Sequence, residues 1–311
     1  MAEMNIYARI LIDEARRRGI DVDEIDSRFN IYALTFNGRT VRCRESLTEK
    51  TSAYAMTVSA NKWLTIKFLR EAGLSVPRQE IWHDERTAAA FLRRAGRLAV
   101  KPLNGEQGRG ITVGVKTVEE LNEAVGKALQ FDDQVLLEEY ITGSDLRVIV
   151  IDYHFVAAIE RVPASVTGNG SSSIGALIAA RNEQLQQETG GESQIPLDED
   201  TTVLLEEQDL DLERVLPEGR RVRVCRLANF HSGGTIEDVT AVVSPELRAV
   251  AEKAASILSL PVVGLDFLVP AVDGDEYMVI EANERPGLAN HEPQPTAERF
   301  IDFLFPETAE K

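Results

Sequence analysis

The sequence is poor in cysteine and has no long apolar run. Its two cysteines, Cys43 and Cys225, are too few for a metal-ligand set, and their positions do not suggest a disulfide. No run of apolar residues approaches the ~18 residues of a membrane-spanning helix. The N-terminus also lacks the basic and apolar pattern of a signal peptide. These absences exclude a cysteine-held metal centre and predict a cytoplasmic protein.

Basic residues are outnumbered by acidic ones, 34 to 51. The formal net charge is -17 and the sequence pI is near 4.8, which argues against nucleic acid or an anionic membrane as the main partner. If the substrate is a polyanion, local basic residues must overcome a repulsive field. Hydrophobic residues make up 43% and charged residues 27% of the 311 residues, which suits a globular protein of two or three subdomains.

Signatures of covalent catalysis are missing too. The chain has no Gly-x-Ser-x-Gly elbow and no Cys/His pairing. Its four histidines, His83, His154, His231 and His291, are scattered without the spacing of metal ligands. The sequence therefore supports neither a protein nucleophile nor a histidine metal site.

Apolar periodicity and turn residues predict an α+β fold. Helices are predicted at 6–18, 62–72, 118–129, 173–187 and 246–258. Strands are predicted at 22–25, 31–36, 39–43, 97–102, 111–115, 134–141, 147–151, 155–162, 264–269 and 277–283. Several strands form hairpins, as at Asn37-Gly38, so mixed or antiparallel sheets are expected.

The last two predicted strands carry polar oxygens in otherwise apolar sequence. Glu281 and Asn283 are two residues apart, so they project from the same face of a strand. A turn at 273–275 would bring Asp266 beside them. A buried carboxylate is tolerated only opposite a cation or a donor. The sequence therefore predicts an all-oxygen cluster suited to Mg²⁺.

A glycine-rich loop lies between the predicted strands 97–102 and 111–115. It follows Lys101 and contains Gly105, Gly108 and Gly110, which would let backbone N–H groups approach phosphate oxygens. It is not a Walker loop, since no Gly-Lys-Ser/Thr follows, and a strand after it excludes the dinucleotide fingerprint. The segment is either a phosphate-binding loop or a flexible β-hairpin loop.

Other segments have two readings each. The strand exit at 136–145 could offer backbone groups to an adenine edge and Asp145 to ribose hydroxyls, or it is a solvated acidic strand end. The glycine turn at 229–234 is an anion cradle or a simple tight turn. Four arginines in strand-like runs suit recognition of carboxylates or phosphates, or they pair on the surface. They are Arg147, Arg161, Arg223 and Arg226.

Together and in this order, these segments resemble the ATP-grasp ligases. They are most similar to the ligase module of cyanophycin synthetase and of bifunctional glutathione synthetases, over nearly the whole chain. The most specific segments are 100–110, 166–170, 229–240 and 281–287. The ending at 284–292 is closest to the ligase part of N-acetylglutaminylglutamine synthetases, which usually carry an acetyltransferase domain ahead of the ligase. This chain has no room for that domain, so the product is left open.

The resemblance implies a role for each matching residue. The implied ATP-binding residues are Lys62 and Lys101 on the phosphates, Gly105, Gly108 and Gly110 in a closing loop, Glu138 and Ile141 on adenine through their backbone, and Asp145 on the ribose. The implied ligands of Mg²⁺, or alternatively Mn²⁺, are Asp266, Glu281 and Asn283. The residues on the side of the reacting groups and the substrate are Arg147, Arg161, Arg226, Asn229, Ser232, Gly233, Gly234 and Arg285. Arg161 would meet the transferred phosphoryl group or the acyl phosphate.

One position departs from the family pattern. Relatives usually place an arginine four residues before the residue that matches Asn229, and here that position is Cys225. Arg226 is adjacent but would face the opposite side of a regular strand. Either a bulge re-aims Arg226, or Arg223 substitutes, or the activity is weakened.

The implied architecture is an ATP-grasp fold that holds the nucleotide between two α+β subdomains, with a small N-terminal α/β subdomain. The expected boundaries are 1–76, 77–141 with the glycine-rich loop, and 142–311 with the metal and substrate site. The resemblance implies an ATP- and Mg²⁺-dependent ligase that joins amino acids or small peptides, with a small glutamine- or glutamate-type dipeptide such as N-acetylglutaminylglutamine as the favoured product. Relatives commonly associate, so a homo-oligomer is one option and the oligomeric state is left open. The alternatives are a cyanophycin-like or glutathione-like ligase, and a nucleotide-binding regulatory subunit without turnover.

Overall fold

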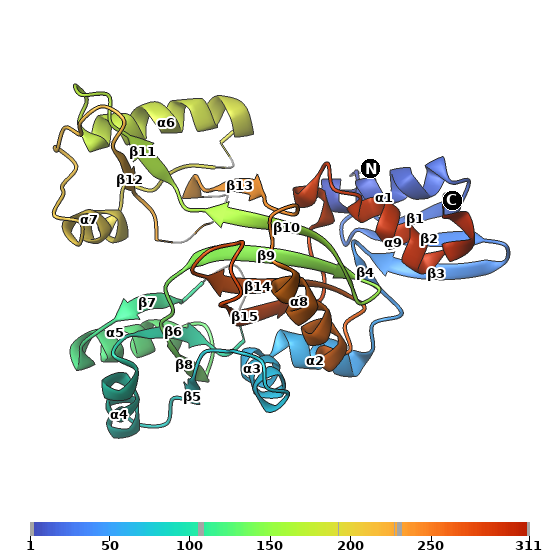
Figure 1. Cartoon of the computed structure of the whole chain (residues 1–311), viewed down its shortest axis with the longest axis horizontal. Coiled ribbons are helices and arrows are strands. Elements are labelled where there is room, and N and C mark those ends of the chain that lie inside the picture. The colour runs from blue at the N-terminus through green and yellow to red at the C-terminus, as the bar shows by residue number, and fades with distance from the viewer. Residues whose placement is uncertain (1–2, 105–108, 192, 227, 229–231, 310–311) are drawn as a thin grey trace. The chain divides into compact units, whose positions relative to one another are not determined.

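The computed structural model describes residues 3–104, 109–191, 193–226, 228 and 232–309 (Figure 1). The chain forms two compact units. The first unit comprises Met1–Ala158 and Val239–Lys311, and the second comprises Ile159–Asp238. The predicted boundaries at 76 and 141 stay a prediction. That division placed 159–238 inside its C-terminal subdomain, whereas these residues form a unit of their own.

The first unit contains both helices and runs of consecutive strands (Figure 1). Its helices are α1 (Ile6–Arg17), α2 (Ala53–Ala60), α3 (Lys62–Glu71), α4 (Glu85–Ala95), α5 (Val118–Ala128), α8 (Pro245–Leu258), α9 (Thr296–Leu304) and the 3₁₀ turns η2 (Leu288–His291) and η3 (Pro306–Thr308). Its strands are β1 (Asp21–Asp26), β2 (Ile31–Phe36), β3 (Arg39–Arg44), β4 (Leu47–Thr48), β5 (Gln79–Ile81), β6 (Leu98–Pro102), β7 (Thr112–Val115), β8 (Val135–Glu139), β9 (Ser144–Ile151), β14 (Val262–Val269) and β15 (Met278–Asn283). Strand β10 (His154–Val162) begins in the first unit and ends in the second. No described helix is long and apolar enough to cross a membrane.

The N-terminal sheet has the order β1-β2-β3-β4, and all its pairs are antiparallel. The β2–β3 hairpin turns at Asn37-Gly38, as predicted, and both residues have the positive φ that such a turn needs. Residues from both ends of the chain pack on this sheet in one apolar cluster, which includes Leu11 of α1, Leu34 of β2 and Phe300 of α9. The first and last segments of the chain therefore share one core.

A second antiparallel sheet has the order β5-β8-β6-β7 and carries α4 and α5 on one face. Leu98 and Val100 alternate with Ala99 and Lys101, so the apolar pair faces the helices and Lys101 lies on the other face. Glu138 of β8 belongs to that same polar face because Ala99 is its partner in register. The sheet thus presents charged residues away from its own core.

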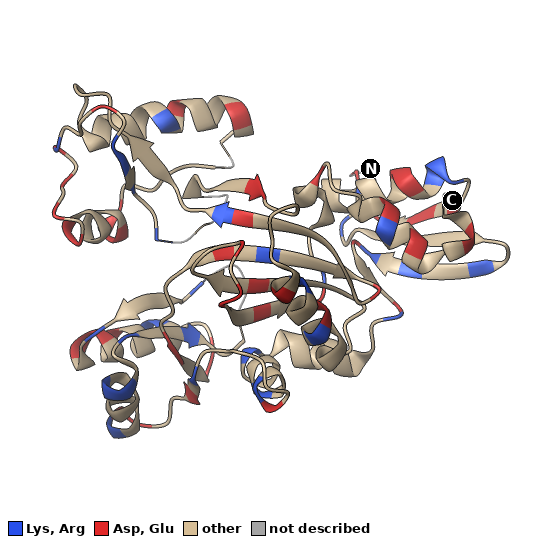
Figure 2. Ribbon diagram, viewed as in Figure 1, with Lys and Arg blue, Asp and Glu red and all other residues tan. Residues whose placement is uncertain are grey.

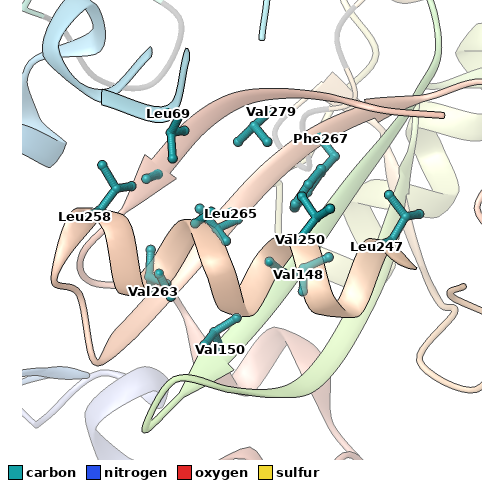
Figure 3. Close-up of a cluster of buried hydrophobic side chains, with 14 of the residues drawn as sticks. Leu69, Val148, Val150, Leu247, Val250, Leu258, Val263, Leu265, Phe267 and Val279 are labelled. Carbon is teal, nitrogen blue, oxygen red and sulfur yellow. The ribbon is translucent and has the colours of Figure 1, made fainter. Parts of the chain in front are cut away.

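The central sheet of the first unit contains β10, β9, β14 and β15, with α8 packed on it. Figure 3 shows the core between them, where Val148, Leu265 and Val250 lie together and are at most 5% exposed. The first six residues of β14 are buried, including the charged Asp266. A strand that carries a carboxylate in such a core must supply it with partners.

The second unit contains β11 (Ser165–Thr167), α6 (Ile174–Thr189), α7 (Glu199–Glu206), β12 (Arg221–Arg223) and β13 (Thr235–Asp238). Strands β11 and β12 pair with each other, and β13 pairs with the end of β10. Ser173 caps α6 with its side chain, as its position before an apolar run predicts. A separate apolar cluster, including Ile174, Leu205 and Leu216, forms the core of this unit.

Gly168 lies where the second unit has no room for a side chain. A Cβ atom at this position would lie 2.2 Å from the carbonyl oxygen of Pro217 and 2.5 Å from the Cβ of Leu216. We expect Gly168→Ala to destabilise this unit by about 2 kcal/mol, because the backbone must move to admit the methyl group. Urea unfolding followed by circular dichroism measures the change.

The matched control is Gly126→Ala inside α5, where a Cβ atom meets nothing within 4 Å. That variant should be more stable than the wild type by roughly 0.5–1 kcal/mol, because alanine is the better helix former. Equal stability of the two variants would contradict the packing argument.

Candidate functional site

The predicted oxygen cluster forms on β14 and β15. Asp266 pairs in register with Glu281, and Gly264 pairs with Asn283. The predicted approach of Asp266 to Glu281 is thus confirmed, although the pairing becomes irregular just after Asp266. The amide of Asn283 donates to the carbonyl oxygen of Gly264 at 3.4 Å. The two carboxylates and the amide therefore lie on one patch of antiparallel sheet.

Arg147 is the partner that the buried carboxylate of Asp266 requires. It lies opposite Asp266 on β9, and its Nε and Nη2 each donate to one carboxylate oxygen at 2.7 Å. The side chains are 18% and 3% exposed, respectively. This two-point geometry fixes both groups and makes the pair much stronger than a single surface contact.

Lys62 brings a second cation to the cluster. It is the first residue of α3, directly after the N-cap Asn61, and its Nζ lies 3.5 Å from Oε1 of Glu281. The Lys62 side chain is 14% exposed and that of Glu281 is 39% exposed. Glu281 is therefore the more accessible of the two carboxylates.

Lys101 and Glu138 form a further ion pair on the polar face of the β5–β8–β6–β7 sheet. Glu138 is buried, and its second oxygen accepts a hydrogen bond from the side-chain amide of Gln79 at 2.7 Å. Glu138 lies in the middle of the sheet between β5 and β6, whereas Ile141 lies beyond the end of β8. Of the two predicted backbone contacts to adenine, the position of Ile141 is therefore the better suited.

These three ion pairs share one property. In each of them, a cation that is predicted to meet phosphates or substrate contacts a carboxylate: Lys62 with Glu281, Lys101 with Glu138, and Arg147 with Asp266. The local cations thereby offset the field of an acidic chain, whose Asp and Glu residues are distributed over its whole length (Figure 2). The pairs keep lysine and arginine in place without ligand.

The donor set fits a hard divalent cation. Asp266, Glu281 and Asn283 offer two carboxylates and one amide oxygen, which are the ligand types that Mg²⁺ takes. Within the described ranges, no three Asp, Glu, His or Cys side chains gather as a metal site, which agrees with a set that needs an asparagine. Both oxygens of Asp266 also contact Arg147, so a bound cation would use their remaining lone pairs.

The glycine-rich loop is described only in part. Gly105 and Gly108 lie outside the described residues. Gly110 has φ +71°, and a Cβ there would lie 2.5 Å from the ring of Phe131, so the position needs glycine. Strands β6 and β7 flank the loop as predicted. Asp145 is the second residue of β9 and pairs with Leu268.

Several predicted residues belong to the second unit. Arg161 lies on β10 opposite Ile236 of β13. Arg226 forms an ion pair with Glu207 at 2.7 Å, with the two side chains 24% and 38% exposed. Gly233 has φ +81°, as expected of a glycine turn, while Asn229 lies outside the described part of the chain. Roles for Arg161, Arg226 and the turn Ser232, Gly233 and Gly234 stay predictions.

Cys225 faces the interior of the second unit. Its side chain is buried, its thiol lies 3.5 Å from the carbonyl oxygen of Ser232, and burial raises its pKa to about 11. Arg223 donates to the carbonyl oxygens of Cys225 and Arg226, so it braces the chain after β12. Because β12 ends at Arg223, the regular alternation assumed for Arg226 does not extend to that residue.

Two polar contacts next to the cluster carry no motif and were not predicted. Nη1 of Arg285 donates to Oε2 of Glu45 at 2.7 Å, and the Ser46 hydroxyl donates to the carbonyl oxygen of Pro286 at 2.6 Å. Glu45 and Ser46 come from the turn between β3 and β4, 240 residues away in sequence. No pattern within either segment indicates these contacts, which depend on how the two segments come together in the fold.

Comparison with known proteins places these features in context. Residues 59–189 match the model of the RimK-like ATP-grasp domain. The chain is 31% identical over 320 residues to the cyanophycin synthetase of Trichormus variabilis, covering 98% of this chain and 35% of the relative. It is 27% identical to the glutathione biosynthesis bifunctional protein of Listeria welshimeri, covering 97% of this chain and 41% of the relative. The chain thus spans between a third and a half of the length of these relatives.

Solved structures agree on the fold. A bifunctional glutathione synthetase from Pasteurella multocida superposes with a TM-score of 0.69 at 24% identity, covering 98% of this chain and 44% of the other. The D-alanine–D-alanine ligase of Bacillus anthracis gives a TM-score of 0.51 at 13% identity, covering 83% of this chain and 70% of the other. The predicted α+β class is confirmed: the chain has the ATP-grasp fold, and the RimK-like ATP-grasp domain is the family model that its residues 59–189 match.

Proposed function

We propose that this protein is an ATP- and Mg²⁺-dependent carboxylate–amine ligase that acts through an acyl phosphate. The observation that carries the proposal is the patch on β14 and β15, where Lys62 contacts Glu281, Arg147 contacts Asp266, and Asn283 lies on the same pair of strands. Cations and oxygen ligands side by side suit a nucleotide that carries a divalent metal. The ATP-grasp fold and the names of the relatives support the same reaction class.

The reaction has two balanced steps. A carboxylate oxygen of the first substrate attacks the γ-phosphorus of ATP, the bond to the β-phosphate oxygen breaks, and ADP leaves. The amine nitrogen of the second substrate then attacks the acyl carbon, the phosphate leaves with the C–O bond electrons, and the amine loses a proton. The product is an amide. Neither step needs a covalent bond to the protein.

The side chains act by binding and by charge. Lys62 and Lys101 exchange their carboxylate partners for phosphate oxygens, and the exchange keeps both ammonium groups paired throughout. Arg147, fixed by Asp266, supplies a preorganised guanidinium next to the reacting groups. Mg²⁺, when bound by Glu281, Asp266 and Asn283, neutralises charge on the phosphates. The backbone after β8, at Ile141, and the carboxylate of Asp145 hold adenine and ribose.

The favoured product is a small glutamine- or glutamate-type dipeptide such as N-acetylglutaminylglutamine. This choice rests on the segment 284–292, which resembles the ligase part of N-acetylglutaminylglutamine synthetases. The net charge of -17 disfavours a long acidic polymer as the substrate. A cyanophycin-like or glutathione-like product is the alternative that the relatives' names suggest.

The test is phosphate release from ATP with a panel of amino acids and N-acetyl amino acids, followed by mass spectrometry of the products. Release that depends on an amino acid, together with a product of the summed mass less water, supports the ligase. ATP binding without release for any acceptor would favour a regulatory subunit without turnover. That second reading draws on one observation, the buried Cys225 at the position where relatives usually have arginine.

A further inference from the structure

The guanidinium group of Arg285 is held through one of its nitrogen atoms. Its Nη1 donates to Glu45 at 2.7 Å, and this is the only hydrogen bond of its side chain within the described residues. The side chain is 28% exposed, compared with 13% for Glu45. A guanidinium group has five N–H donors, so the edge formed by Nε and Nη2 is open to a further acceptor. That edge matches the two oxygens of a carboxylate.

Glu45 is itself fixed by neutral donors. Its Oε1 accepts from the side-chain amides of Asn5 at 2.8 Å and Asn30 at 3.3 Å. Its backbone N–H donates to the carbonyl oxygen of Asn30, and its own carbonyl oxygen accepts from the Tyr32 hydroxyl at 2.9 Å. The carboxylate therefore has one defined position before Arg285 reaches it.

The backbone of Glu45 is unusual for this residue type. Its φ is +51°, in the left-handed region where glycine or asparagine is the ordinary choice. Holding a glutamate there costs about 1 kcal/mol relative to the right-handed region. The contacts of the Glu45 side chain with Asn5, Asn30 and Arg285 help to hold the backbone in this conformation.

The segment around Arg285 is anchored next to the oxygen cluster. Arg285 follows Asn283 by two residues, and the next residue, Pro286, receives the hydrogen bond of the buried Ser46 hydroxyl. A Cβ atom at Gly264 would lie 3.0 Å from the Cβ of Pro286 and 3.8 Å from the Cδ of Arg147. Arg285 therefore starts from a rigid point beside the patch of β14 and β15.

We propose that Glu45 is a positioning residue: held by Asn5 and Asn30, it fixes one corner of Arg285 so that the Nε/Nη2 edge binds the free carboxylate of the amine acceptor. The acceptor is then an α-amino acid rather than an amine or an amino-acid amide. This inference rests on the proposed ligase function. If the pair of Glu45 and Arg285 were purely structural, breaking it would affect the use of acceptors with and without a carboxylate equally. A carboxylate-binding role predicts an effect only on acceptors that have a carboxylate.

The experiment compares L-glutamine with L-glutaminamide as acceptors in ATP-dependent phosphate release, with a mixture of N-acetyl amino acids as donors. N-acetyl groups block the donors from acting as acceptors, and L-glutaminamide lacks the α-carboxylate. We expect the wild type to prefer L-glutamine, and Glu45→Gln to raise KM for L-glutamine roughly tenfold, with little change in kcat or in KM for ATP. KM for L-glutaminamide should stay the same. Arg285→Gln should remove the preference altogether.

The matched control is Glu49→Gln, which changes a 45% exposed carboxylate just after β4 that pairs with Arg42 at 3.6 Å. It should leave both acceptors unaffected. An equal change for L-glutamine and L-glutaminamide in Glu45→Gln would overturn the inference in favour of a structural ion pair.

A second readout separates this inference from the ligase proposal. The thermal unfolding midpoint is measured with a non-hydrolysable ATP analogue and either L-glutamine or L-glutaminamide. Stabilisation by L-glutamine but not by L-glutaminamide, weakened in Glu45→Gln and lost in Arg285→Gln, supports the carboxylate site even where the wild type shows no turnover. Turnover with equal response to both compounds would support the ligase and overturn the inference. No turnover and no stabilisation by either compound would contradict both.

Discussion

Replacing Glu281 with alanine is expected to reduce ATP-dependent phosphate release by at least about 100-fold. Glu281 is the more accessible of the two carboxylates of the cluster, with 39% of its side chain exposed, and it lies opposite the buried Asp266. Its removal leaves one carboxylate that is already shared with Arg147, together with the amide of Asn283. Such a set is too weakly charged to hold Mg²⁺ against water.

The measurement is a titration of MgCl₂ at saturating ATP and amino acids, with ATP binding followed separately by equilibrium dialysis. The variant removes the contact between Glu281 and Lys62 but keeps Lys62 itself, so nucleotide binding without metal should survive. Glu276→Ala, at an exposed carboxylate before β15, is the matched control and should remain fully active. Full activity of Glu281→Ala would remove the metal assignment.

The geometry of the cluster was predictable because its parts are close in sequence. Only residues 270–277 separate β14 from β15, so the pattern of the two strands predicts a pairing that sets Asp266 beside Glu281. The partners of these carboxylates were not predictable in the same way. Arg147 lies 119 residues from Asp266, and a strand arginine fits a surface position as well as a buried pair. Only the packing of β9 against β14 distinguishes the two.

Some helices and strands could be predicted from the sequence and others could not, and the difference has physical reasons. Long amphipathic helices such as α1 and α8 were predicted within one residue at either end. Helix α2 was not predicted, because its sequence AYAMTVSA has no polar face to give a period. Helix α9 was also left out, although its apolar residues recur at helical spacing. In the second unit, the two paired strands β11 and β12 have only three residues each, too few for a clear alternation.

Replacing Glu14 with alanine is expected to have the largest effect on stability, a loss of about 3 kcal/mol. Glu14 of α1 accepts from Nε of Arg18 at 2.5 Å, and Arg18 also donates to Asp302 of α9 at 2.5 Å. The Arg18 and Glu14 side chains are only 5% and 8% exposed. Removing Glu14 leaves the buried Arg18 guanidinium with one carboxylate partner, Asp302, instead of two.

The matched control is Glu24→Ala. It removes an ion pair with Arg16 of the same helix at 2.7 Å, where the two side chains are 42% and 52% exposed. An exposed pair of this kind contributes only about 0.2–1 kcal/mol to stability. Both variants lose one negative charge, so the difference between them reports the effect of burying the ion pair. Chemical denaturation at pH 7 measures both. A loss below 1 kcal/mol in Glu14→Ala would show that the network between α1 and α9 does not stabilise the fold.

The pH dependence gives an independent check on Glu14. The hydrogen bond from Arg17, followed by the contacts with Arg18, lowers the pKa of Glu14 below its ordinary value of 4.5, against the opposing effect of burial. A carboxyl group whose folded pKa is lowered binds fewer protons in the folded state, so its stabilisation is complete above about pH 4.5 and is lost as the pH falls through the lowered value. The stability difference between wild type and Glu14→Ala should therefore be constant from pH 7 to about pH 5 and shrink below it. A difference that grows on acidification would contradict the direction of the shift, and with it the assignment of Glu14 as the ionised centre of this network.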